Sequence, residues 1–177
     1  EGTYKKITAS GTEYFAHVVI VATGTNERTL GYDGDDALLG KGLSYCAVCD
    51  GAFFKEKDVI VIGGGNSALE ESVYLTQFAN NVNLVIRRDE FRASKAMYHR
   101  VMNTSNIEVI YNTEAQEILG DGQVVTGVRV VNNKTNETQN LDVTGFFVAI
   151  GHKPNTELFQ GILDMDETGY LITQPNV

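Results

Sequence analysis

The sequence predicts an α/β fold in which a parallel β-sheet is combined with helices and with an antiparallel β-meander. Three observations predict it: an apolar strand that runs into a glycine-rich turn, strands and helices that alternate after that turn, and several short β-rich segments before a last apolar strand. The length of 177 residues allows one sizeable domain, or one domain with extra pieces.

The first strand and helix flank the glycine-rich turn. Residues 58–62 form a short continuous apolar run, which is typical of a central parallel strand covered on both faces. A helix is expected to begin near Asn66, with Glu70 and Glu71 on a different face from its apolar residues. The residues at helical spacing are Leu69, Val73 and Thr76.

The alternation of strand and helix then continues. The expected elements are a strand at 82–86, a helix at 94–104 and a strand at 107–111. Met97 and Val101 are expected to face inward from the helix. This βαβαβ pattern corresponds to half of a Rossmann unit.

A β-meander is expected next, before the chain returns to the parallel sheet. Its strands are expected at 117–119, 124–131 and 139–143, with turns at 120–122 and 132–134. Residues 146–150 then form the returning strand. The whole is a Rossmann-like three-layer domain with a parallel sheet and an antiparallel meander.

The N-terminal region is expected to belong to a different domain. Residues 4–9 and 14–22 read as a hairpin whose second arm becomes a buried strand. Residues 25–44 are polar and rich in glycine, with Asp33, Asp35 and Asp36 close together, as in a connection between domains. A boundary is therefore expected near residue 26.

A repeated pattern within the sequence extends this interpretation. A hairpin that leads into Val21-Ala22-Thr23-Gly24 recurs as a hairpin that leads into Val148-Ala149-Ile150-Gly151. Because the second copy closes a dinucleotide-binding unit, the first is expected to close another one, whose opening strand and glycine loop would precede residue 1. The chain is thus expected to be a piece of a larger protein with two nucleotide domains.

Composition excludes several functions. A net charge of −9 and a pI near 4.7 disfavour nucleic-acid binding, and no apolar run reaches membrane-spanning length. Two cysteines cannot form a disulfide framework of the secreted type, so we expect a cytoplasmic protein. No metal site is expected, because the three histidines, His17, His99 and His152, are scattered singly.

The glycine-rich turn has the spacing of a dinucleotide site. In Gly63-x-Gly65-x-x-Ala68, the first glycine allows a tight turn, the second lets the backbone approach a pyrophosphate, and Ala68 permits close packing of helix on strand. A merely structural glycine turn is the alternative, which the flanking strand and helix disfavour.

Basic residues follow the second strand, where an NAD site would carry an acid. They are Arg87, Arg88 and Arg92. Guanidinium groups match the extra 2′-phosphate of NADPH, so NADPH is favoured over NADH. The alternative is a solvated helix start, since Asp89 and Glu90 lie beside them.

The pair Cys46-x-x-Cys49 can close a small disulfide reversibly. Asp50 follows it directly and is a candidate proton donor and acceptor, or else a turn residue before Gly51. Zinc binding is disfavoured, because it normally needs two further ligands at matching spacing. A thioredoxin fold is disfavoured because the pair precedes a nucleotide loop.

Four motifs in this order carry a family resemblance. They are Cys46-Ala47-Val48-Cys49-Asp50-Gly51-Ala52-Phe53-Phe54, Gly63-Gly64-Gly65-Asn66-Ser67-Ala68-Leu69-Glu70-Glu71, Arg87-Arg88-Asp89-Glu90-Phe91-Arg92 and Gly151-His152-Lys153-Pro154-Asn155-Thr156. The chain resembles the NADPH-binding domain of bacterial-type, low-molecular-weight thioredoxin reductases, with flanking pieces of the FAD domain.

The resemblance implies roles for individual residues. Cys46 would attack thioredoxin, Cys49 would lie nearest the flavin, and Asp50 would be the general acid. The pyrophosphate would be lined by Gly63, Gly65, Asn66, Ser67 and Ala68, and the 2′-phosphate would be held by Arg87, Arg88 and Arg92.

The resemblance also implies a domain plan and partners. Residues 26–152 would be the NADPH domain that carries the disulfide, and residues 1–25 and 153–177 would be parts of an FAD domain. The intact protein would bind FAD, act on thioredoxin and form a homodimer. This chain alone is expected neither to hold FAD nor to turn over. Asp33 stands where the family would have proline, which is expected to be a harmless change.

Two other functions fit the same motifs. One is the flavoprotein subunit of an alkyl hydroperoxide reductase, which passes electrons to its own fused dithiol domain and is disfavoured by the Ala47-Val48 spacer. The other is a non-catalytic NADPH-binding redox module.

Overall fold

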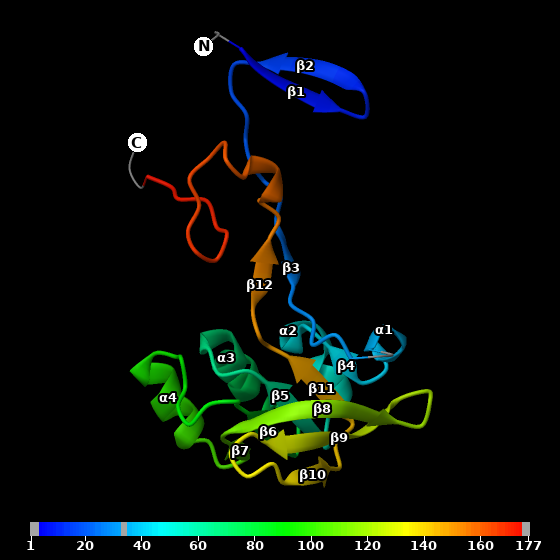
Figure 1. The fold of residues 1–177 in the computed structure, drawn as a ribbon. Helices are drawn as coiled ribbons and strands as arrows, with labels where there is room; N and C mark the ends of the chain where they lie inside the picture. Colours follow the sequence, from blue (N-terminus) through cyan, green and yellow to red (C-terminus); the bar gives the residue numbers. More distant parts are fainter. Residues whose placement is uncertain (1–3, 33–34, 175–177) are drawn as a thin grey trace. The chain divides into compact units, whose positions relative to one another are not determined.

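The computed structural model describes residues 4–32 and 35–174 (Figure 1). The chain divides into two compact units, one made of residues 1–26 and 153–177, the other of residues 27–152. Asp33, in the expected connection, lies outside the described residues. The interpretation of the first unit as part of an FAD domain stays a prediction.

A five-stranded parallel sheet forms the centre of the second unit, in the order β4-β11-β5-β6-β7 (Figure 1). Its strands are β4 (Leu43–Ser44), β5 (Asp58–Ile62), β6 (Asn81–Val85), β7 (Ile107–Ile110) and β11 (Gly145–Val148). The expected βαβαβ run and the returning strand are confirmed. The edge strand β4 was not expected, because two residues carry no periodicity.

Helices α3 (Asn66–Leu75) and α4 (Lys95–Met102) connect β5, β6 and β7. Leu69 is fully buried, and Val101 is 1% exposed with Met97 packed beside it, so the expected inward faces are confirmed. Ser94 caps α4, since its hydroxyl accepts the Met97 N–H at 3.3 Å. Shorter helical segments precede β5, and they are α1 (Asp35–Leu38), α2 (Ala47–Asp50) and η1 (Gly51–Phe54).

The two faces of the sheet are buried by different layers. On β5, Val59 and Val61 pack into the core formed with the helices, and the alternate residues Ile60 and Ile62 pack into a second core formed with the meander. Burial on both faces explains why this strand is continuously apolar. The three-layer arrangement expected from the sequence is confirmed.

The meander is a three-stranded antiparallel sheet of order β10-β9-β8 (Figure 1). Its strands are β8 (Thr113–Gly120), β9 (Val125–Asn132) and β10 (Thr138–Leu141). Strand β8 begins earlier than the expected 117, because its first residues alternate buried and exposed from Thr113 onward.

In the first unit, β1 (Lys5–Ala9) and β2 (Thr12–Ala16) form the expected hairpin. The prediction that its second arm continues as a buried strand is wrong. Residues 17–24 form no strand, and Val18 and Ile20 are 76% and 87% exposed. The physical reason is that no strand among the described residues pairs with this apolar segment.

Three further elements complete the described chain. They are β3 (Thr25–Glu27), β12 (His152–Pro154), which pairs with β3, and η2 (Glu157–Phe159). Within the described residues, no helix has the length and apolar character needed to span a membrane.

Candidate functional site: a dinucleotide cavity and a redox disulfide

The turn between β5 and α3 requires glycine at its first position. Gly63 has φ +150°, and a Cβ there would lie 2.3 Å from the Ala149 carbonyl oxygen and 2.8 Å from the Ala68 Cβ. At Gly64 a Cβ would lie 2.7 Å from Ile86 Cγ2. The turn is therefore pressed against β11, α3 and the end of β6.

Gly65 differs from its neighbours, because no atom lies within 4 Å of the position a Cβ would take. It is the N-cap of α3, it makes no side-chain capping bond, and it lines a cavity. The start of α3 thus presents uncapped N–H groups, the arrangement that binds phosphate at helix N-termini. The open space beside Gly65 lies where the sequence predicts the pyrophosphate.

The cavity has a volume of about 470 Å³. That size lies within the range of small-molecule and cofactor sites. Of the residues predicted to bind the nucleotide, six line the cavity: Gly63, Gly65, Ser67, Arg87, Arg88 and Arg92. Asn66 and Ala68 are not among its lining residues; Ala68 is fully buried under the turn.

Asn66 instead connects the turn to α4. Its side-chain oxygen accepts the Ser94 N–H at 2.8 Å. Beside it, the Arg92 N–H donates to the Gly64 carbonyl oxygen at 2.7 Å, and Gly65 and Arg92 form a parallel bridge. The basic loop is therefore held directly against the glycine turn.

The backbone of Arg87 and Arg88 is also fixed. The Arg87 carbonyl oxygen accepts from Asn133 Nδ2 at 2.6 Å, and the Arg88 carbonyl oxygen accepts the Asn112 N–H at 2.9 Å. All three arginine side chains are exposed, and none forms an ion pair with another described residue. Three guanidinium groups on a fixed backbone are available to an anion at the cavity mouth.

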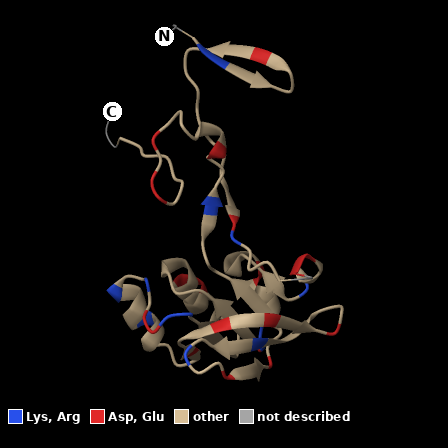
Figure 2. Cartoon of the chain, viewed as in Figure 1, with Lys and Arg blue, Asp and Glu red and all other residues tan. Residues whose placement is uncertain are grey.

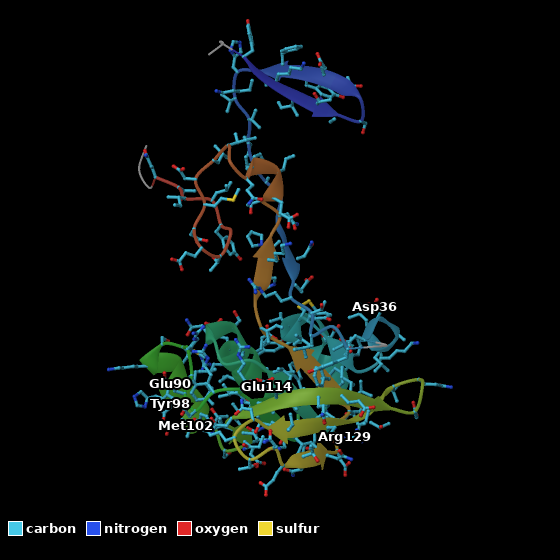
Figure 3. All side chains as sticks on the ribbon, in the orientation of Figure 1. Asp36, Glu90, Tyr98, Met102, Glu114 and Arg129 are labelled. Atoms are coloured by element: carbon cyan, nitrogen blue, oxygen red, sulfur yellow. A yellow bond between two sulfur atoms is a disulfide. The ribbon has the colours of Figure 1, made fainter. Side chains whose placement is uncertain are left out.

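Figure 2 shows basic positions on α4 and on the segment before it, and acidic positions along β8. Two acidic residues, Glu90 and Glu114, which are labelled in Figure 3, also line the cavity, as does Arg28. Sequence reasoning missed these three as lining residues. For Glu114 a signal existed: it follows the end of β7, and the carboxyl ends of parallel strands border the ligand site in such sheets.

Cys46 and Cys49 form a disulfide across one turn of helix, with Cα atoms 5.3 Å apart. Cys46 is the N-cap of α2, and its Sγ accepts the Cys49 N–H at 3.2 Å. Cys46 is half-buried and Cys49 is exposed. A hydrogen bond from an amide to this sulfur favours the thiolate form of Cys46 when the disulfide opens.

Asp50 is positioned by Ser44, a residue of β4 that sequence reasoning missed. The Ser44 hydroxyl donates to Asp50 Oδ2 at 2.6 Å and accepts the Cys46 N–H at 3.0 Å. One buried serine thereby joins the carboxylate to the disulfide segment. Neither cysteine, nor Asp50, lines the cavity, so the structure does not bring the disulfide and the dinucleotide cavity into one site.

Among residues 4–32 and 35–174, no group of three or more His, Cys, Asp or Glu side chains is arranged to hold a metal ion.

The comparisons with known proteins agree with this geometry. Residues 2–177 match the family model described as pyridine nucleotide-disulphide oxidoreductase. The chain is 49% identical over 171 residues to the thioredoxin reductase of Streptomyces coelicolor, covering 96% of this chain and 53% of that protein. It is 48% identical over 174 residues to that of Mycolicibacterium smegmatis, covering 98% of this chain and 56% of that protein.

Solved structures show the same likeness. The thioredoxin reductase of Lactococcus lactis, in its FR conformation, superposes with a TM-score of 0.87 at 38% identity, covering 99% of this chain and 58% of that chain. That of T. acidophilum gives 0.84 at 33% identity, covering 96% of this chain and 56% of that chain. This chain thus spans about half the length of the curated relatives it matches. The family model matches nearly the whole chain, and the paired cysteines agree with it: this chain belongs to the pyridine nucleotide-disulphide oxidoreductase family.

Proposed function

We propose that this chain is the NADPH-binding and redox-disulfide part of a thioredoxin reductase. The observation that carries the proposal is the presence, in one compact unit, of two features. One is a cavity lined by three arginines that pair with no described carboxylate, and the other is a disulfide whose Cys46 N–H is bonded to Ser44 beside Asp50. The relatives named thioredoxin reductase, at 48–49% identity, support the choice of thioredoxin as the partner.

We assign NADPH to the cavity through its two phosphate groups, the pyrophosphate and the 2′-phosphate. The pyrophosphate lies against the uncapped start of α3, where Gly65 leaves room and Ser67 lines the cavity. The 2′-phosphate carries nearly two negative charges and is bound by the exposed guanidinium groups of Arg87, Arg88 and Arg92. These three residues select NADPH over NADH.

The cavity described in the first unit is a poor site for FAD. The cavity in the first unit is lined by several carboxylates, including Asp164, Asp166 and Glu167, which would repel a diphosphate. We therefore assign FAD binding to other parts of the intact protein, and residues 1–25 and 153–177 to the margins of that domain. FAD, when bound there, supplies the chemistry that connects a two-electron hydride donor to a disulfide.

The residues of this chain carry the thiol chemistry. A dithiol formed from Cys46–Cys49 attacks the thioredoxin disulfide through the Cys46 thiolate, and Cys49 then attacks the mixed disulfide and releases reduced thioredoxin. The Cys49 N–H supports this order, because it hydrogen-bonds the Cys46 sulfur. Asp50 gives a proton to the departing thiolate and is oriented for that by Ser44.

A trapping experiment tests the roles of the two cysteines. A thioredoxin that lacks its resolving cysteine is mixed, as its activated mixed disulfide, with the reduced protein carrying Cys49→Ser or Cys46→Ser. We expect a stable covalent complex with Cys49→Ser and none with Cys46→Ser. The reverse pattern would exchange the two roles, and no complex with either variant would remove thioredoxin as the partner.

A further inference from the structure

Two adjacent glutamates of α3 differ sharply in environment. Glu70 is exposed, whereas Glu71 is half-buried, and its Oε2 is buried with no hydrogen-bond partner among the described residues. Burial raises the pKa of the Glu71 carboxyl, and the nearby Ala47 N–H lowers it by a smaller amount. A buried acceptor left without a partner is rare and calls for a reason.

Helix α3, which carries Glu71, packs against the disulfide segment. Ala47 follows Cys46 directly, is only 1% exposed, and its amide nitrogen is a few covalent bonds from the Cys46 sulfur. The segment is also pressed onto α3 just beyond the disulfide, since a Cβ at Gly51 would lie 3.1 Å from Leu75 Cδ2. Glu71 therefore sits in a closely packed contact between α3 and the Cys-x-x-Cys turn.

A carboxylate in this place changes the energetics of the cysteine pair. Opening the disulfide produces a thiolate, and a nearby negative charge in a poorly solvated contact disfavours that anion. When the thiolate of a cysteine pair is strongly stabilised, the reduced form of the pair is favoured, and its disulfide form is therefore a strong oxidant. A protein that must give electrons away needs the opposite, a dithiol whose thiolate is not overstabilised.

We propose that Glu71 acts on the redox equilibrium of the Cys46–Cys49 pair: it keeps a negative charge near the pair, so that the dithiol is a better electron donor. This inference rests on the proposed function, because it explains the residue by the direction of electron flow. The other carboxylate of the segment, Asp50, is bonded to Ser44 and has a separate role.

The test compares Glu71→Gln with Glu70→Gln in the whole chain. Glutamine keeps the shape of the side chain but removes the charge, and Glu70 is the matched control one position away. The reduced chains are alkylated with iodoacetamide over a range of pH. Separately, at pH 8, the chains are equilibrated with glutathione. In this exchange two glutathione thiols are oxidised to one glutathione disulfide while the Cys46–Cys49 disulfide is reduced to two thiols.

We expect Glu71→Gln to move the half-point of alkylation to a lower pH, by about one unit, and to shift the glutathione equilibrium toward the dithiol roughly tenfold. Glu70→Gln is expected to match the unaltered chain in both. Superimposable curves for Glu71→Gln and the unaltered chain would overturn the inference.

Glu71→Met provides a second uncharged variant of similar volume, with the same expected shifts, if glutamine impairs folding. Neither measurement uses thioredoxin, NADPH or FAD. A negative result would therefore refute the role of Glu71 and leave the proposed function standing, whereas failure of the trapping experiment would leave these shifts measurable.

Discussion

The Ser44 hydroxyl donates a 2.6 Å hydrogen bond to the Asp50 carboxylate, and Ser44 also accepts the Cys46 N–H at 3.0 Å. Through this one side chain, the two-residue strand β4 determines where the proposed proton donor stands relative to the cysteines. The bond is formed inside the fold, because Ser44 is only 2% exposed.

Replacing Ser44 with alanine is expected to slow thioredoxin reduction by the intact protein roughly tenfold, because hydrogen bonds to charged groups contribute about 1.5–3 kcal/mol. The measurement is kcat/KM for thioredoxin. Ser105→Ala, at an exposed position, is the control and should have no effect. An unchanged rate for Ser44→Ala would separate Ser44 from the function of Asp50.

Arg88→Ala is expected to weaken NADPH binding about tenfold and to leave NADH binding unchanged, because we propose that the guanidinium group binds only the 2′-phosphate. Titration of both nucleotides measures this. Arg100→Ala is the control, since Arg100 is exposed on α4 and outside the cavity. NADPH binding to the unaltered chain should also weaken with salt. Equal losses for NADPH and NADH would refute 2′-phosphate recognition.

The glycine turn supplies a paired prediction. Gly63→Ala is expected to destabilise the chain by at least about 2 kcal/mol, because its Cβ would meet the Ala149 carbonyl oxygen at 2.3 Å at a φ of +150°. At Gly65 the backbone φ is −93° and an added Cβ would meet no atom, so Gly65→Ala should change the stability little. NADPH binding should be lost, because the Cβ would occupy the space assigned to the pyrophosphate. Thermal unfolding and NADPH titration distinguish the two. The assignment fails if Gly65→Ala binds NADPH normally.

The pKa of Glu71 predicts a dependence of stability on pH. Burial raises this pKa above its ordinary value of 4.5. The folded state therefore holds the proton more tightly than the unfolded state, and stability is lost as pH rises from 4.5 through the raised pKa. Glu71→Gln should be more stable than the unaltered chain at pH 8, and the difference should vanish at pH 3. Denaturant unfolding of both chains at pH 8 and pH 3 measures this difference in stability. A difference that is the same at both pH values would contradict the raised pKa.

Much of the fold follows from local sequence patterns. Residues 58–62 and the glycines after them could be identified because an apolar run, a turn and a helical periodicity succeed one another within a few residues. The disulfide followed from spacing alone. The arginines were found because their distance beyond the glycines matches the length of a βαβ unit.

Other features depend on contacts between distant segments. Glu71 was expected to share a face with Glu70, and its burial arises only because the Cys-x-x-Cys turn packs on α3. Ser44 gave no signal, because β4 is defined by pairing with β11 a hundred residues later. The exposure of Val18 and Ile20 likewise could not be foreseen, since an apolar run predicts burial but not the partner that provides it.

The most direct test of the proposed function is NADPH-dependent reduction of thioredoxin by the intact protein that contains this chain, with and without Cys46→Ser. We expect the unaltered protein to be active and Cys46→Ser to be at least about a thousandfold slower, with NADPH binding preserved because neither cysteine lines the cavity. Thioredoxin reduction at an unchanged rate in Cys46→Ser would contradict the proposed function.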